Sequence, residues 1–223
     1  MKNDILEKSL SKMGLKDMLR KTYEYTNSGG LNTVAYISGR KLLGALENEE
    51  HERLWSKLDL IVLEDEEILR VLELATSARI REVEENKYLK EFLKFAAKEQ
   101  KEIFLLADTD ELLEILEGEL QSLQSALCIT GRASLEDYPE NKEALINIIN
   151  LTAPRIILSR LTPPADISMM NEYGSYLNPS LWMALPEAII ERKKTGLLDK
   201  INKFIYKKLL NRKINHSKDT EKK

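Results

Sequence analysis

The feature that most constrains the fold is the alternation of apolar runs with helix-patterned segments between residues 101 and 166. The three runs are IFLLA, ALCITG and RIILS, and two segments of helical pattern separate them. This order predicts a βαβαβ unit, so any chemistry is expected where the strands end, at 107–109, 130–132 and 160–166. These ends carry no glycine-rich phosphate loop and no pair of His or Cys residues.

The same alternation continues over most of the chain. We predict strands at 31–38, 59–65, 102–107, 126–130 and 155–159, and an extended run at 180–185. Helices are predicted at 3–26, 40–58, 66–75, 86–98, 110–123, 141–151, 164–174, 186–194 and 197–212, and a polar stretch contains Arg79 and Arg81. The pattern predicts an α/β fold with a mostly parallel, Rossmann-like sheet and helices on both of its faces.

Four parts follow from this pattern. They are an N-terminal helical segment at 1–30, an α/β domain at 31–190, a basic amphipathic helical appendage at 191–213 and a disordered tail at 214–223. No apolar run approaches the roughly 20 residues of a transmembrane helix, and the first residues are too polar for a signal peptide. We therefore expect a cytoplasmic protein.

The few cysteines and histidines argue against a metal or redox centre. The one cysteine, Cys128, lies within an apolar run and is expected to be a buried core residue. His51 lies in the charged run ENEEHERLW and is expected to be solvated, and His216 lies in the tail. We therefore expect no metal and no cofactor.

The net charge of −3 conceals two parts of opposite sign. Residues 191–223 contain 12 Lys and Arg against four Asp and Glu, a net charge of +8, which leaves −11 on residues 1–190. The acidic body argues against a duplex nucleic-acid binder, which needs a basic face on the folded domain.

The basic tail has apolar residues at helical spacing with lysines between them. Such a helix can lie on an anionic membrane surface, and it can equally pack on the acidic body of its own chain. The predicted membrane-binding residues are Leu197, Lys200, Ile201, Lys203, Phe204, Lys207, Lys208 and Arg212.

Several strand ends form a set with a known counterpart. The set comprises Ile37-Ser38-Gly39, Asp65 in LIVLEDEE, Arg81 in REVEENKYLKEFL, Leu105-Leu106-Ala107, Ile129-Thr130-Gly131 and the segment INIINLTAPRIILSRLTPPAD. In order and spacing it resembles the WecG/TagA/CpsF glycosyltransferase family over about residues 31–190. The last segment is similar to the family's Ile-Asn, Pro-Asp-Ile-Leu, Gly-Leu-Gly-x-Pro-x-Gln-Glu signature and keeps Asn150, Pro154 and Pro163.

The resemblance implies an activity and a set of roles. Enzymes of this family transfer an N-acetylmannosamine-type or similar sugar from a UDP donor to a polyprenyl-diphosphate-linked acceptor at the inner face of the bacterial membrane. Asp65 would be the general base, and Arg81, or a tail arginine such as Arg212, would stabilise the leaving UDP. The implied substrate-binding residues are Ala107, Gly131, Thr162, Pro163 and Asp166. Helices at both ends leave room for contacts with a second copy or a protein partner.

The chain departs from the signature where a donor would bind. The two glycines are Ser159 and Leu161, the glutamine is Ala165 and the glutamate is Asp166. Glycine lets a backbone approach a diphosphate, whereas Arg160 and Leu161 bring bulk. Neither Ala165 nor Gly39 supplies an amide side chain. The alternative is therefore a non-catalytic relative that serves as a membrane-associated partner or regulatory subunit.

The individual candidates also have readings that involve no chemistry. Asp65 is equally suited to cap the helix that follows it. Arg79 and Arg81 could be ordinary solvated charges, and Thr162 or Asp166 could cap the helix near 164–174.

Overall fold

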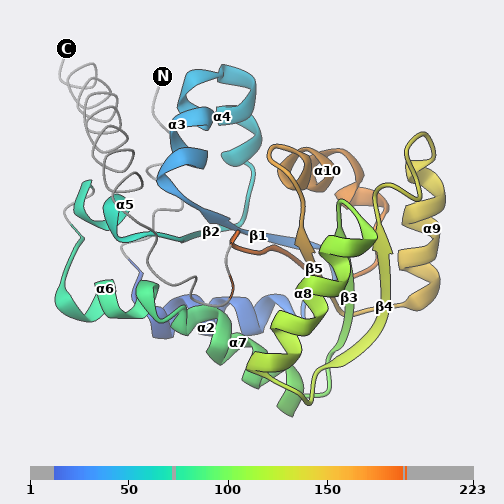
Figure 1. The fold of residues 1–223 in the computed structure, drawn as a ribbon, viewed down its shortest axis with the longest axis horizontal. Helices are drawn as coiled ribbons and strands as arrows, with labels where there is room; N and C mark the ends of the chain where they lie inside the picture. The colour runs from blue at the N-terminus through green and yellow to red at the C-terminus, as the bar shows by residue number, and fades with distance from the viewer. Residues whose placement is uncertain (1–12, 72–73, 188, 190–223) are drawn as a thin grey trace.

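The computed structural model describes residues 13–71, 74–187 and 189, and it contains a six-stranded parallel sheet of order β2-β1-β6-β5-β3-β4 (Figure 1). The strands are β1 Asn32–Ile37, β2 Leu60–Leu63, β3 Glu102–Ala107, β4 Cys128–Ser134, β5 Ile156–Arg160 and β6 Leu181–Ala184. Strands β2 and β6 are apolar throughout, and β1, β3 and β5 contain unbroken apolar runs, as expected of strands covered on both faces. The predicted α/β fold with a parallel sheet is thus confirmed.

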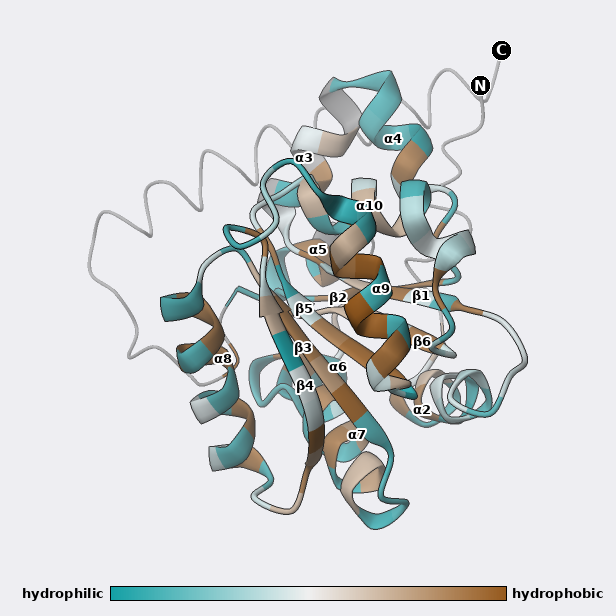
Figure 2. Ribbon diagram, turned by 90° about the vertical axis from the view of Figure 1, so that its right-hand side faces the viewer, coloured by the Kyte–Doolittle hydropathy of each residue, from teal (hydrophilic) through white to brown (hydrophobic). Residues whose placement is uncertain are grey.

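Helices cover both faces of the sheet. They are α2 Leu15–Tyr25, α3 Gly39–Glu47, α4 Glu49–Trp55, α5 Glu66–Val71, α6 Ser77–Glu84, α7 Lys87–Lys98, α8 Asp110–Leu123, α9 Lys142–Thr152 and α10 Ala165–Tyr173, with a 3-10 turn η1 at Gly174–Tyr176. One core cluster holds buried side chains of α3, α4, α5, α9 and α10, and the other holds those of α2, α7 and α8. Figures 1 and 2 show the sheet between these two layers.

The connections explain which helix lies on which face. The crossovers β1 to β2, β4 to β5 and β5 to β6 run toward β2 and carry α3, α4, α9 and α10. The crossovers β2 to β3 and β3 to β4 run the other way and carry α7 and α8 on the opposite face, while α5, at the start of the first of them, still packs in the cluster of α3 and α4. Crossovers between parallel strands are right-handed, so connections that run in opposite directions along the sheet place their helices on opposite faces.

The N-terminal segment packs on the body through α2. The rings of Tyr23 and Phe95 stack with centroids 3.9 Å apart, and Thr22 Oγ1 lies 2.5 Å from the Tyr88 hydroxyl. Helix α2 therefore forms part of the layer that contains α7.

Two expected elements are divided differently. The helix predicted over 40–58 is two helices, because Asn48 has an extended backbone and its side chain accepts hydrogen bonds from the first turn of α4. The polar stretch with Arg79 and Arg81 is helical, because the Thr76 hydroxyl caps α6 at Arg79 N (3.3 Å). The predicted boundaries were wrong at both places.

Strand β4 lies further along the chain than predicted. It runs from Cys128 to Ser134, so 130–132 is strand interior and the end lies at Ser134. Cys128, at the first position of the strand, is half-buried rather than fully buried.

The C-terminal predictions are only partly covered. The described residues Pro186, Glu187 and Ile189 are not helical, so the helix expected at 186–194 is wrong over that part. The helix expected at 197–212 and the tail at 214–223 lie outside the described residues. Among the described helices, none is long and apolar enough to cross a membrane.

Candidate functional site

A cavity of about 360 Å³ opens at the carboxyl edge of the sheet, beside the ends of β1, β5 and β6. Its lining combines apolar residues with four that can carry charge. The apolar wall includes Trp55 of α4, Pro163 and Pro164 of the β5–α10 turn, and Ile167 of α10. The residues that can carry charge are Lys41, His51, Asp166 and Glu187. A concave, mostly apolar site with a few convergent polar groups is typical of small-molecule binding.

Lys41 is placed by the turn that leads from β1 into α3. Ser38 caps this helix, with its hydroxyl accepting from Lys41 N at 3.3 Å. The Lys41 ammonium lies 3.4 Å from Glu64 Oε2, and the two side chains are only 11% and 15% exposed. Lys41 is the only Lys or Arg among the described lining residues of the cavity.

Glu64 follows β2 and links Lys41 to the segment after β6. Its Oε1 accepts a hydrogen bond from Glu187 N at 3.1 Å. Burial raises the pKa of the Glu64 carboxyl, while the Lys41 ammonium lowers it. The ammonium group is therefore held in place at the cavity wall by a carboxylate outside the lining.

Asp166 also lines the cavity and is fixed by a buried chain of hydrogen bonds. Trp182 Nε1 donates to Ser159 Oγ at 2.8 Å, and Ser159 Oγ donates to Asp166 Oδ1 at 2.5 Å. Leu161 N donates to Asp166 Oδ2 at 3.1 Å. Burial raises the pKa of Asp166 to about 6, against the lowering effect of the Ser159 and Leu161 hydrogen bonds and of Lys41.

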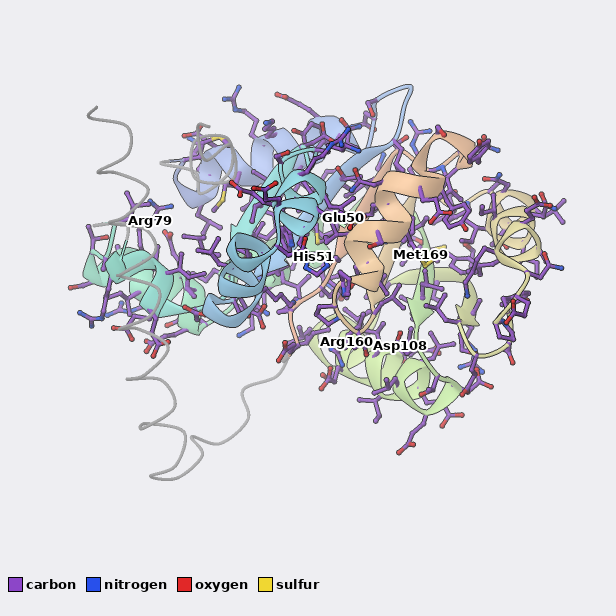
Figure 3. All side chains as sticks on the ribbon, turned by 90° about the horizontal axis from the view of Figure 1, so that it is seen from above. Glu50, His51, Arg79, Asp108, Arg160 and Met169 are labelled. Carbon is purple, nitrogen blue, oxygen red and sulfur yellow. The ribbon has the colours of Figure 1, made fainter. Side chains whose placement is uncertain are left out.

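His51 reaches the cavity because α4 begins at Asn48. Asn48 Oδ1 accepts from Glu50 N at 2.9 Å and from His51 N at 3.3 Å, so His51 lies in the first turn of the helix. The imidazole is half-buried at the cavity. The expectation that His51 is an ordinary solvated residue was wrong, because the break at Asn48 could not be seen in the charged run around it. Figure 3 shows His51 toward the centre of the molecule.

Asp65 holds two backbone segments together. Its Oδ1 accepts from Ile68 N at 3.0 Å and its Oδ2 accepts from Gly39 N at 2.6 Å. The hydrogen bond to Ile68 confirms that Asp65 caps α5, and the one to Gly39 ties the start of α3 to the end of β2. Asp65 is not among the cavity-lining residues, and its role as a general base stays a prediction.

The two arginines of α6 lie apart from the cavity. Arg81 is exposed, and Arg79 Nη2 donates to Met13 O at 2.9 Å. Helix α6 packs against α5 and α7, and Figure 3 shows Arg79 well separated from His51. The structure does not bring Arg81 together with the lining residues, and its catalytic role stays a prediction.

The predicted substrate-binding residues fall into two groups. Pro163 and Asp166 line the cavity. Thr162 is exposed, and its N and Oγ1 both donate to Asp108 Oδ2 at 2.7 Å. Ala107 is fully buried at the end of β3. Neither Thr162 nor Asp166 caps α10, because Asp108 and Ser159 respectively engage their side chains.

Gly131 has a packing reason for being glycine. It lies inside β4 opposite Phe104, where an added Cβ would come within 2.7 Å of the Phe104 ring and 2.9 Å of Thr152. The expectation that this glycine ends its strand was wrong, and a substrate-binding role for it stays a prediction.

The bulky residues Arg160 and Leu161, at the place of the signature's Gly-Leu-Gly, do not line the cavity. Arg160 Nη2 pairs with Glu119 Oε2 at 2.5 Å on α8, and Leu161 is buried in the core. Figure 3 shows Arg160 beside Asp108, below His51 and Met169. The replacements therefore leave the described cavity open.

Sequence reasoning missed Lys41, Glu64, His51 and Glu187. A signal was present for Lys41, because it stands in the first helical turn after the strand end Ile37-Ser38-Gly39. The others depend on strand order and on the helix break, which local patterns do not encode. No group of metal-ligating side chains suits an ion within the described residues.

The whole of this framework corresponds to one family model. The model is described as the WecG/TagA/CpsF glycosyl transferase family and matches residues 3–189, which include all six strands and the cavity. No curated protein matches the chain.

Proposed function

Because the chain belongs to the WecG/TagA/CpsF glycosyltransferase family, we propose that it transfers a sugar from a UDP donor to a polyprenyl-diphosphate-linked acceptor of bacterial surface-polymer synthesis. The observation that carries the proposal is the cavity at the strand ends, which is lined by the nearly buried ammonium of Lys41, itself paired with Glu64, and by the carboxyl group of Asp166. Ligands of parallel α/β sheets bind at this edge.

Lys41 is the proposed contact to the donor diphosphate. A lysine ammonium pairs with phosphate oxygens as a point charge, and its low exposure reduces screening by solvent. The nearby carboxylates Glu64, Asp166 and Glu187 outnumber it, so the donor needs further positive charge. We propose that a tail arginine such as Arg212 supplies it, as the basic composition of 191–223 suggests.

Calorimetric titration with UDP and with UDP-N-acetylhexosamines tests donor binding. We expect Lys41→Ala to weaken binding at least about tenfold, in line with the roughly 1.5–3 kcal/mol of a charged hydrogen bond. Lys57→Ala is the matched control, because Lys57 is an exposed lysine just after α4 and outside the lining. Equal loss in both variants would contradict the role of Lys41.

A non-catalytic partner or regulatory subunit is the second candidate. The observation in its favour is that both oxygens of Asp65, the residue in the position of the family's base, accept backbone N–H groups. This candidate predicts that the native chain binds no UDP-sugar and forms a stable complex with an active transferase or envelope protein.

We further propose that residues 197–212 bind the inner face of the cell membrane. The support is the amphipathic, lysine-rich pattern of this segment, which lies beyond the residues that match the family model. A membrane-bound tail would bring the cavity near a lipid-linked acceptor.

A further inference from the structure

His51 is held at the cavity by the packing of its helix. The Asn48 cap fixes the first turn of α4, and Asn171 Nδ2 of α10 donates to Leu54 O at 3.3 Å. Trp55, in the last turn of α4, is only 7% exposed and lines the same cavity. Figure 3 shows His51 on the side of α4 that faces α10. The half-buried imidazole therefore has a defined position at the cavity wall.

The charges of the cavity do not by themselves suit a diphosphate. Lys41 is the only Lys or Arg among the described lining residues, and its ammonium is already paired with Glu64 at 3.4 Å. The lining also contains the carboxyl groups of Asp166 and Glu187. A diphosphate brings further negative charge, and like charges close together repel each other. Its binding therefore favours any protein group that can become more positive.

His51 is the only described lining residue that can gain a positive charge near neutral pH. A carboxyl group that takes up a proton becomes neutral, so it stops repelling the ligand but does not attract it. An imidazolium has two N–H donors and a full charge, and both suit phosphate oxygens. Partial burial also reduces the screening of this charge by solvent.

We propose that His51, in its protonated form, binds the diphosphate of the sugar donor together with Lys41, so that donor binding takes up a proton. This inference rests on the proposed function. It adds a cationic contact from the folded body to the one proposed for the tail. The affinity for the donor should therefore fall as the pH rises through about 6.5, where histidine loses its proton.

Other groups at the cavity also respond to pH. The groups that can titrate or carry charge around His51 are Tyr36 of β1, Lys41 of α3, Glu64 after β2, Asp166 of α10 and Glu187 after β6. The first turn of α4 itself carries Glu49, Glu50 and Glu52. Asp166 is the main competitor for the proton, because burial raises its pKa to about 6. The experiment therefore needs a variant of each residue.

Calorimetric titration with a UDP-N-acetylhexosamine, repeated between pH 6 and pH 8 in buffers of different ionisation enthalpy, measures the affinity and the protons taken up. The diphosphate of this donor is esterified at both ends, whereas a terminal phosphate titrates near pH 6 and would add its own protons. We expect the native chain to bind at least about fivefold more tightly at pH 6 than at pH 8. His51→Gln should bind about five- to tenfold more weakly than the native chain at pH 6, and within about twofold of it at pH 8. His216→Gln, at the only other histidine of the sequence, is the matched control and should leave the profile unchanged.

Two further variants separate the charge of His51 from a merely structural role. His51→Lys keeps a positive charge at every pH used, so the donor affinity should hold at pH 8 and its pH dependence should shrink. Asp166→Asn should retain most of the pH dependence, because the proton is assigned to His51. The same titration with a short-chain prenyl-diphosphate-linked sugar should show no proton uptake that depends on His51.

Several results would overturn the inference alone. They are a donor affinity that does not change with pH, a pH dependence that survives in His51→Gln and is lost in Asp166→Asn, and a proton uptake by His51 that accompanies the lipid-linked acceptor and not the donor. A native chain that binds no UDP-sugar at any pH would instead contradict the proposed function itself. Should His51→Gln fail to fold, the profile of His51→Lys decides, and an unchanged pH dependence there overturns the proposal.

Discussion

Asp166 illustrates how one buried carboxyl couples stability to pH. Its pKa in the folded chain is about 6 and its ordinary value is 3.8, so the folded state keeps a proton that the unfolded state has already lost. Stability from this group is therefore fully present below about pH 4 and is lost as the pH rises through about 6. The largely buried Glu64 carboxyl, whose pKa is also raised by burial, acts in the same direction.

The predicted loss of stability with rising pH can be measured with Asp166→Asn. Each pKa unit corresponds to about 1.4 kcal/mol, so the native chain should lose about 2–3 kcal/mol relative to the variant between pH 4 and pH 7. Urea unfolding of both proteins at the two pH values gives the difference, and the Glu64 contribution cancels because both proteins contain it. A stability difference that is the same at pH 4 and pH 7 would contradict the buried, raised carboxyl.

Gly131 provides a packing prediction at the same scale. Gly131→Ala places a Cβ against the Phe104 ring and Thr152, and we expect a loss of about 1–3 kcal/mol in unfolding free energy. Gly118→Ala is the control, because nothing lies within 4 Å of its added Cβ inside α8. There the change should stabilise the chain by up to about 1 kcal/mol. Two variants of equal stability would show that the contact at Gly131 is relaxed.

At the scale of elements, the break between α3 and α4 shapes the cavity. A single helix over 40–58 would continue past Asn48, whereas the extended residue there ends α3 and starts α4 in a new direction. Lys41 on one helix and His51 and Trp55 on the other therefore line the same cavity.

The Asn48 cap gives this geometry a test. Asn48→Ala should cost about 1 kcal/mol of stability and also weaken UDP binding, because the first turn of α4 carries His51. Asn141→Ala removes the equivalent cap of α9, whose Oδ1 accepts from Ala144 N at 3.0 Å away from the cavity lining. It should cost similar stability with donor affinity unchanged. Unfolding midpoints and calorimetry measure both quantities, and equal affinities in the two variants would contradict the proposed link.

At the scale of the whole molecule, strand β6 lies in the middle of the sheet and joins the pair β2-β1 to the strands β5-β3-β4. This last strand pairs with β1 on one side and with β5 on the other, in parallel register. It brings Glu187 and Ala184 to the cavity beside the turn at Pro163. The cavity thus combines residues from Tyr36 to Glu187 and exists only once the sheet is complete.

The charge division of the chain gives a prediction at this scale. Co-sedimentation with anionic vesicles should capture the full chain and not a chain truncated after Arg192, because the basic apolar pattern lies beyond that point. Binding should weaken with added salt and be slight on purely zwitterionic vesicles. Equal capture of the full and truncated chains would contradict membrane binding by the tail and leave packing on the acidic body as the alternative.

The amino-acid sequence by itself determined the kind and order of most elements in the described chain, because the period of apolar residues is a local property. It also placed Pro163 and Asp166 among the candidate residues. The tertiary structure alone decided the strand order, the break at Asn48, the far end of β4 and the burial of Asp166 by Ser159 and Trp182. These features depend on contacts between residues that are distant in the chain. A local sequence pattern does not specify which distant segment will pack against it.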